Sequence, residues 1–166
     1  MPQPTEFEQY MLELVNNARA NPLEESGRLN IDLNDNLSPG TISTDAKQPL
    51  AFNPILAGAA RQHSQWLIDE ERFSHTGAGG SSARDRILAT GYAATTTGEN
   101  LAYSASSRPL NPQRTTVSHH ENLFRSSGHR RNMLNPNFRE VGLGIMAGGP
   151  FQGLSDVMMT TQKYGS

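Results

Sequence analysis

Histidines carry most of the chemistry that this sequence could perform. The chain has five of them, and they stand at His63, His75, His119, His120 and His129. It contains no cysteine, which excludes thiolate nucleophiles, disulfides, zinc fingers and iron–sulfur clusters. Any bound metal ion would therefore need imidazole and carboxylate ligands.

The sequence contexts of three histidines either favour a structural role or limit how many of them can face one site. His63 falls on the apolar face of an expected helix, between Ala59 and Trp66, and this context is typical of a packed core side chain. His119 and His120 are adjacent on another expected helix and point roughly 100° apart, so only one of them can face a given site.

The remaining two histidines and one glutamate form the candidate site. His75 follows an aromatic residue at a helix exit, and His129 follows Ser127-Gly128 at a helix entry, where loops meet rigid elements. Glu99 stands between glycine and asparagine at the start of an expected strand. Two neutral imidazoles and a carboxylate suit a divalent cation such as zinc, with an open position for water. The same three groups could instead form a hydrogen-bonded structural cluster.

Common catalytic motifs are missing from the sequence. The pair His120-Glu121 is not followed by a second histidine at the spacing of a zinc protease, and the glycine pairs carry no phosphate-binding lysine. No serine lies in the Gly-x-Ser-x-Gly context of a hydrolase nucleophile.

Length and charge limit the fold and the partners. A chain of 166 residues is long enough for one domain with its own core. Its 14 Lys and Arg against 16 Asp and Glu leave a net charge of −2, which provides no cationic field for nucleic acid. The apolar runs are too short for a membrane span, and residues 1–4 lack the features of a signal peptide. We therefore expect no nucleic-acid partner and no transmembrane segment.

Apolar periodicity and capping signals predict helices followed by strands. The predicted helices cover residues 5–21, the segment that opens at 53, and residues 82–91, 115–126 and 129–134. The predicted strands begin at 98 and 141 and cover 157–164, and residues 23–50 are predicted to form a long polar loop. This order indicates an α+β class, with helices packed on a sheet.

Six short motifs occur in a characteristic order along nearly the whole chain. They are Asn53-Pro54-Ile55-Leu56, Phe73-Ser74-His75, Gly91-Tyr92, Gly98-Glu99-Asn100-Leu101-Ala102, Ser127-Gly128-His129-Arg130-Arg131-Asn132 and Val141-Gly142-Leu143-Gly144. Together they resemble the CAP superfamily of cysteine-rich secretory proteins, antigen 5 and plant pathogenesis-related 1 proteins, whose domains are also called SCP domains. The absence of cysteine resembles the bacterial, disulfide-free branch.

The resemblance implies a single domain over residues 1–166, built as a three-layer α-β-α sandwich with a central antiparallel sheet and a large cleft. The family's cleft carries two histidines and two glutamates. His75, Glu99 and His129 match three of these, while Ser126 stands near the position of the second glutamate.

Two residues on the same helix could replace the missing glutamate if the helix were rotated. They are Glu121 and His120, one turn or so before Ser126.

Two functions follow from the resemblance and remain open at this point. In the first, the protein is an extracellular or envelope module, expected to be a monomer. Its cleft, organised by His75, Glu99 and His129, binds a lipid, sterol, peptide or cell-wall fragment, with a weakly bound zinc ion. In the second, His75 and His129 hold a divalent metal and Glu99 acts as the general base of a hydrolase.

Overall fold

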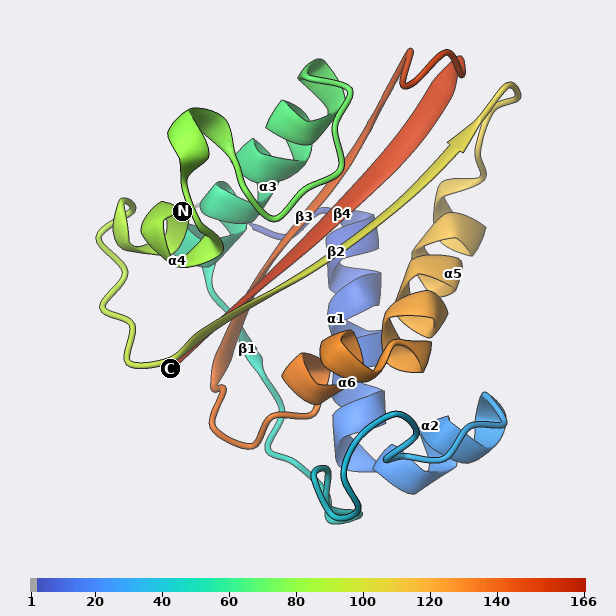
Figure 1. Ribbon diagram of the computed structural model, residues 1–166, viewed down its shortest axis with the longest axis vertical. Coiled ribbons are helices and arrows are strands. Elements are labelled where there is room, and N and C mark those ends of the chain that lie inside the picture. Colours follow the sequence, from blue (N-terminus) through green and yellow to red (C-terminus); the bar gives the residue numbers. More distant parts are fainter. Residues whose placement is uncertain (1–2) are drawn as a thin grey trace.

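The computed structural model describes residues 3–166, which form helices on both sides of one sheet (Figure 1). The helices are α1 (Glu6–Ala20), α2 (Pro22–Arg28), α3 (Pro54–Asp69), α4 (Ala83–Leu88), α5 (Pro112–Arg125) and α6 (Ser127–Met133), with a short 3₁₀ turn at Ala78–Gly80. The strands are β1 (Ala51–Phe52), β2 (Thr97–Ser106), β3 (Glu140–Gly148) and β4 (Asp156–Gly165).

The sheet has the order β1-β3-β4-β2, so β2 forms one of its edges. The central strand β4 runs antiparallel to both β2 and β3. The predicted antiparallel sheet is therefore confirmed. The short β1, which pairs in parallel with β3, was not predicted, because a two-residue strand carries no periodic pattern.

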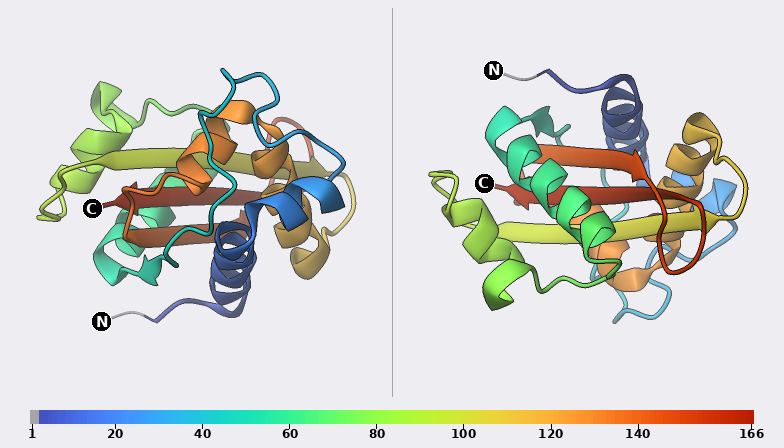
Figure 2. Two further views of the ribbon diagram at one scale, coloured as in Figure 1. Left: turned by 90° about the horizontal axis from the view of Figure 1, so that it is seen from below. Right: turned by 90° about the horizontal axis from the view of Figure 1, so that it is seen from above.

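Helices cover both faces of the sheet. In Figure 2, α3 and α4 lie on one face, while α1, α5 and α6 lie on the other. The three-layer α-β-α sandwich is thus confirmed. Among the described residues, no helix combines the length and the apolar character that a membrane crossing requires.

Two glycines allow α3 to pack directly on β3. A Cβ atom at Gly142 would lie 2.0 Å from the backbone carbon of Leu56, and one at Gly144 would lie 2.3 Å from that of Ala60. These distances are far shorter than any normal contact, so only glycine permits this approach of helix and strand. The glycines that alternate with apolar residues in Val141-Gly142-Leu143-Gly144 are therefore explained by the packing of α3 on β3.

The long polar segment predicted over residues 23–50 begins with a helix. Asn21 caps α2 by accepting a hydrogen bond from the backbone amide of Glu24, and Pro22 occupies the first turn. The connection that follows extends from residue 29 to β1.

Two buried arginines hold this connection against the helical layer. Arg19 donates to the carbonyl oxygen of Gln48 at 2.9 Å, and Arg130 donates to that of Leu33, also at 2.9 Å. Both arginine side chains are fully buried. Because buried polar groups need hydrogen-bond partners, each guanidinium group and the carbonyl oxygen that it contacts satisfy one another.

The boundaries of two other elements differ from the prediction. Helix α5 starts three residues earlier than expected because Asn111 caps it through the amide of Arg114. Strand β2 begins at Thr97, one residue before the predicted start, and continues to Ser106, because every residue from Thr97 to Ser106 pairs with β4.

Candidate functional site

Glu99 is the centre of the candidate site. It lies on β2 directly opposite Lys163 of β4, and directly paired residues project from the same face of a sheet. The Nζ atom of Lys163 lies 2.5 Å from Oε2 of Glu99, and both side chains are buried. The sheet register alone therefore places a cation against this carboxylate.

A second cation reaches Glu99 from α4. Nη2 of Arg86 donates to Oε2 at 2.8 Å and to Oε1 at 3.1 Å, and it also donates to the carbonyl oxygen of His75 at 2.9 Å. Helix α4 begins with a capping box formed by Ser82 and Asp85, which fixes the start of the helix that carries Arg86.

His75 is the exposed member of the site. Its Nδ1 atom lies 2.9 Å from Oε1 of Glu99, and 57% of its side chain is exposed. An ionised carboxylate only accepts hydrogen bonds, so Nδ1 is the donor, and in the neutral ring Nε2 is left as an acceptor. Glu99 therefore sets the tautomer and orientation of His75.

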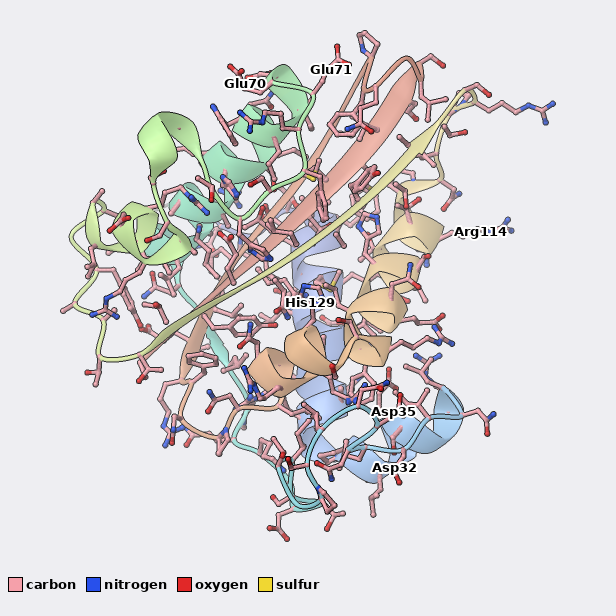
Figure 3. The ribbon with its side chains drawn as sticks, viewed as in Figure 1. Asp32, Asp35, Glu70, Glu71, Arg114 and His129 are labelled. Carbon is pink, nitrogen blue, oxygen red and sulfur yellow. The ribbon has the colours of Figure 1, made fainter. Side chains whose placement is uncertain are left out.

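His129 approaches from the opposite helical layer (Figure 3). Its ring centroid lies 6.4 Å from that of His75. Burial and the nearby charge of His75 lower the pKa of His129, which favours its neutral form. The backbone of α6 is fixed to β2 because Asn100 donates to the carbonyl of His129 at 3.1 Å, and Asn132 donates to that of Glu99 at 3.2 Å.

His63 is buried, as predicted, but it also belongs to the surroundings of Glu99. Its Nε2 atom lies 3.1 Å from the carbonyl oxygen of Ser74 and 4.0 Å from Oε1 of Glu99. Burial lowers the pKa of His63 to about 4, and the charges of Arg86 and Lys163 act in the same direction against that of Glu99. His63 is therefore neutral near pH 7.

Opposing effects determine the ionisation of Glu99. Burial by itself raises its pKa, but the hydrogen bond from His75 and the charges of Lys163 and Arg86 outweigh burial and lower the pKa to about 2. The carboxylate therefore stays ionised at any pH near neutrality.

The structure does not bring the proposed replacements for the second glutamate to this site. The carboxylate of Glu121 accepts from Nη1 of Arg28 at 2.7 Å, and Nε2 of His120 lies 2.8 Å from Oε1 of Glu25. Both side chains are thus directed to α2. Ser126 links α5 to α6 and adds no carboxylate.

His119, the neighbour of His120, does not join the site either. It is buried between the hydroxyl groups of Ser104 and Thr160, at 3.0 and 2.9 Å.

The donor set does not fit a catalytic zinc centre. Such a centre needs three protein ligands, and residues 3–166 contain no group of three or more His, Cys, Asp or Glu placed to hold a metal ion. The oxygens of Glu99 already accept from Lys163, Arg86 and His75. Only the imidazoles of His75 and His129 remain as ligands.

Comparison with known proteins agrees with this fold and with the sequence motifs. The family model described as "CAP: Cysteine-rich secretory protein family" matches residues 12–164. The chain belongs to the CAP family. Within this family's fold, His75 comes from the connection that follows α3, Glu99 from β2 and His129 from α6, and the three meet at the β2 edge of the sheet.

One curated protein is similar to part of this chain. The protein YkwD of Bacillus subtilis (strain 168) is 32% identical over 102 residues, which cover 61% of this CAP chain and 37% of YkwD. The chain thus spans well under half the length of this relative.

Solved structures share the fold at low sequence identity. An extracellular SCP-domain protein from Bacillus anthracis aligns with a TM-score of 0.58 and 19% identity, over 99% of this chain and 45% of that protein. An outer surface protein from Borrelia burgdorferi aligns with a TM-score of 0.62 and 14% identity, over 99% of this chain and 97% of that protein.

Proposed function

We propose that this CAP domain is a ligand-binding module in which the imidazoles of His75 and His129 contact the ligand and Glu99 organises them. The observation that carries the proposal is the set of bonds to Glu99. Its carboxylate accepts from Lys163, Arg86 and His75, and therefore anchors the ring of His75, beside which the ring of His129 lies.

The same bonds argue against the hydrolase alternative. A general base needs an accessible oxygen and a pKa near the working pH. Glu99 is buried, and its oxygens are ion-paired with Lys163 and Arg86. Its pKa is about 2, so the carboxylate is a very weak proton acceptor. No other observation in the site favours hydrolysis.

The groups available to a ligand are hydrogen-bonding rings. More than half of the His75 side chain is exposed to solvent, and His129 is half-buried beside it. Neutral imidazoles accept and donate hydrogen bonds, so they suit the polar part of a lipid, sterol, peptide or cell-wall fragment. In this proposal the ligand binds without a metal, and zinc attaches only weakly between the two rings.

We further propose an extracellular or envelope location and a monomeric state. The location rests on membership in a family described as secretory and on similarity to an extracellular and an outer surface protein. Cell fractionation that recovers the native protein only in the cytoplasm would contradict it.

The proposal is tested by titrating the protein with one probe of each class while recording the imidazole signals of His75 and His129 by NMR. The probes are a fatty acid, a sterol, a short peptide and a soluble cell-wall fragment, each with chelator present. We expect one class to shift both rings saturably. Absence of a shift with every class, or a shift that requires added zinc, would contradict the proposal.

A double variant and a matched control show whether the rings themselves bind. The substitutions His75→Ala and His129→Ala together should abolish binding. Thr76→Ala combined with Arg131→Ala changes exposed neighbours in the same two segments and should preserve it.

A further inference from the structure

A cavity of about 480 Å³ lies between α3 and α4, next to the Glu99 cluster. This volume is within the range of small-molecule pockets in proteins. Arg86 and His63 form part of its wall, and both also approach Glu99. The rings of His75 and His129 are not among the lining residues, so this cavity is distinct from the site described above.

One wall of the cavity carries two stacked aromatic rings, of which Trp66 is the more exposed. The rings of Trp66 and His63 are stacked, with centroids 5.8 Å apart and planes inclined by 10°. The small side chains of Ala59, Ala78 and Ala89 line the rest of the apolar wall and leave room for a ring-sized body.

The polar part of the wall is cationic. The lining residues are Ala59, Gln62, His63, Trp66, Ala78, Ser81, Arg86, Ala89 and Thr90, which include one permanent positive charge and no acidic group. Glu99 neutralises only one of the two charges of Arg86 and Lys163, so the cluster at this wall keeps a net positive charge that favours anionic over cationic ligands.

Arg86 also has an unused hydrogen-bond donor. Its Nη1 donates to the carbonyl oxygen of Ser81 at 2.7 Å, and its Nη2 donates to Glu99 and His75. Its Nε is buried and has no acceptor among the described residues. Buried donors are nearly always bonded, so this nitrogen favours a ligand that brings an acceptor.

From these features we infer that the cavity between α3 and α4 binds a small anion with a flat apolar body, such as an aromatic carboxylate. The ring lies against the wall formed by Trp66 and His63, and the carboxylate faces the guanidinium group of Arg86. Charge-assisted bonds between guanidinium and carboxylate are among the strongest that proteins form.

Trp66 gives this inference a direct readout, because it is the only tryptophan in the chain. Its indole N–H yields one signal in a ¹H–¹⁵N NMR spectrum. Titration with benzoate should shift this signal saturably, and benzylamine, a cation of similar size, should bind at least about tenfold more weakly. No saturable shift with benzoate, or equal binding of benzylamine, would overturn the inference.

Variants separate this cavity from the His75–His129 site. Ala89→Leu fills the cavity from an exposed position and should abolish the benzoate shift, while Ala93→Leu, in an exposed loop that does not line the cavity, should preserve it. Ala78→Leu serves as a second filling variant if the first fails to fold. An unchanged shift in a folded filling variant would refute the inference.

The double variant His75→Ala and His129→Ala should bind benzoate like the wild type. This result keeps the test independent of the proposed function.

Discussion

Lys163 and Glu99 face each other across two neighbouring strands, with Nζ and Oε2 2.5 Å apart in the interior of the protein. Neither side chain could remain charged there alone, because an isolated buried charge is strongly unfavourable. Their pairing, together with Arg86, converts a candidate catalytic carboxylate into a fixed anchor for His75.

Replacement of Lys163 should therefore destabilise the protein and disturb the site. We expect Lys163→Met to reduce the free energy of unfolding by about 3 kcal/mol, because it removes one partner of a buried ion pair. Urea denaturation provides the measurement. The double variant Lys163→Met and Glu99→Gln should recover part of the loss, and strictly additive effects would show that the two side chains do not interact.

Close packing of α3 on β3 leads to a second prediction. Gly144→Ala should reduce the free energy of unfolding by about 3 kcal/mol, because its Cβ would overlap the backbone of α3 at Ala60. Gly58→Ala is the matched control, since no atom lies within 4 Å of its added Cβ. That helical substitution should instead stabilise the protein by about 0.5–1 kcal/mol. Equal effects of the two substitutions on thermal unfolding would contradict the packing.

Buried histidines make stability depend on pH. Burial lowers the pKa of His119 from 6.5 to about 4, so below pH 6.5 the unfolded chain takes up a proton that the folded chain does not. The free energy of unfolding should thus fall as pH decreases from 6.5 to 4, by up to about 3 kcal/mol for this residue. His63 contributes in the same direction and over the same range.

The variant His119→Gln isolates one of these contributions. It should show a shallower decrease of unfolding free energy between pH 6.5 and 4 than the wild type. Parallel curves for the two proteins would show that His119 titrates normally in the folded state.

Zinc binding should be weak and should require the rings of both His75 and His129. Calorimetric titration should give a free energy far smaller in magnitude than the roughly 10–16 kcal/mol of structural zinc sites, because only two imidazoles are available. Binding should fade as pH falls below about 6.5, since a protonated imidazole cannot ligate. An isotherm that shows tight zinc binding would contradict the prediction that only these two imidazoles bind the ion. Identical isotherms for the wild type and the His75→Ala, His129→Ala double variant would also contradict it.

Local sequence signals predicted most of the helices and strands. The capping signals at the predicted starts near residues 5 and 53 are the Thr5–Glu8 capping box and the Asn53-Pro54 cap, and both are present in the structure. Helix α2 is not among the predicted elements because its seven residues lack apolar periodicity, and the helix predicted over residues 5–21 ends at Asn21. The structure shows that Asn21 also caps α2.

The candidate site was only partly predictable. Family motifs indicated His75, Glu99 and His129. Lys163 and Arg86 were missed because their contacts with Glu99 depend on the register of β2 against β4 and on the position of α4, neither of which a linear pattern specifies. A lone lysine in a strand of buried residues was the one available signal.

The ionisation of Glu99 tests the central claim most directly. NMR titration of ¹³C-labelled glutamate carboxyl groups, with Glu99 assigned by comparison with Glu99→Gln, measures its pKa in the folded protein. We predict a value of about 2, as expected for an ion-paired anchor. A Glu99 carboxyl that titrates at or above its ordinary value of 4.5 would contradict the account, because such a group could serve as a general base.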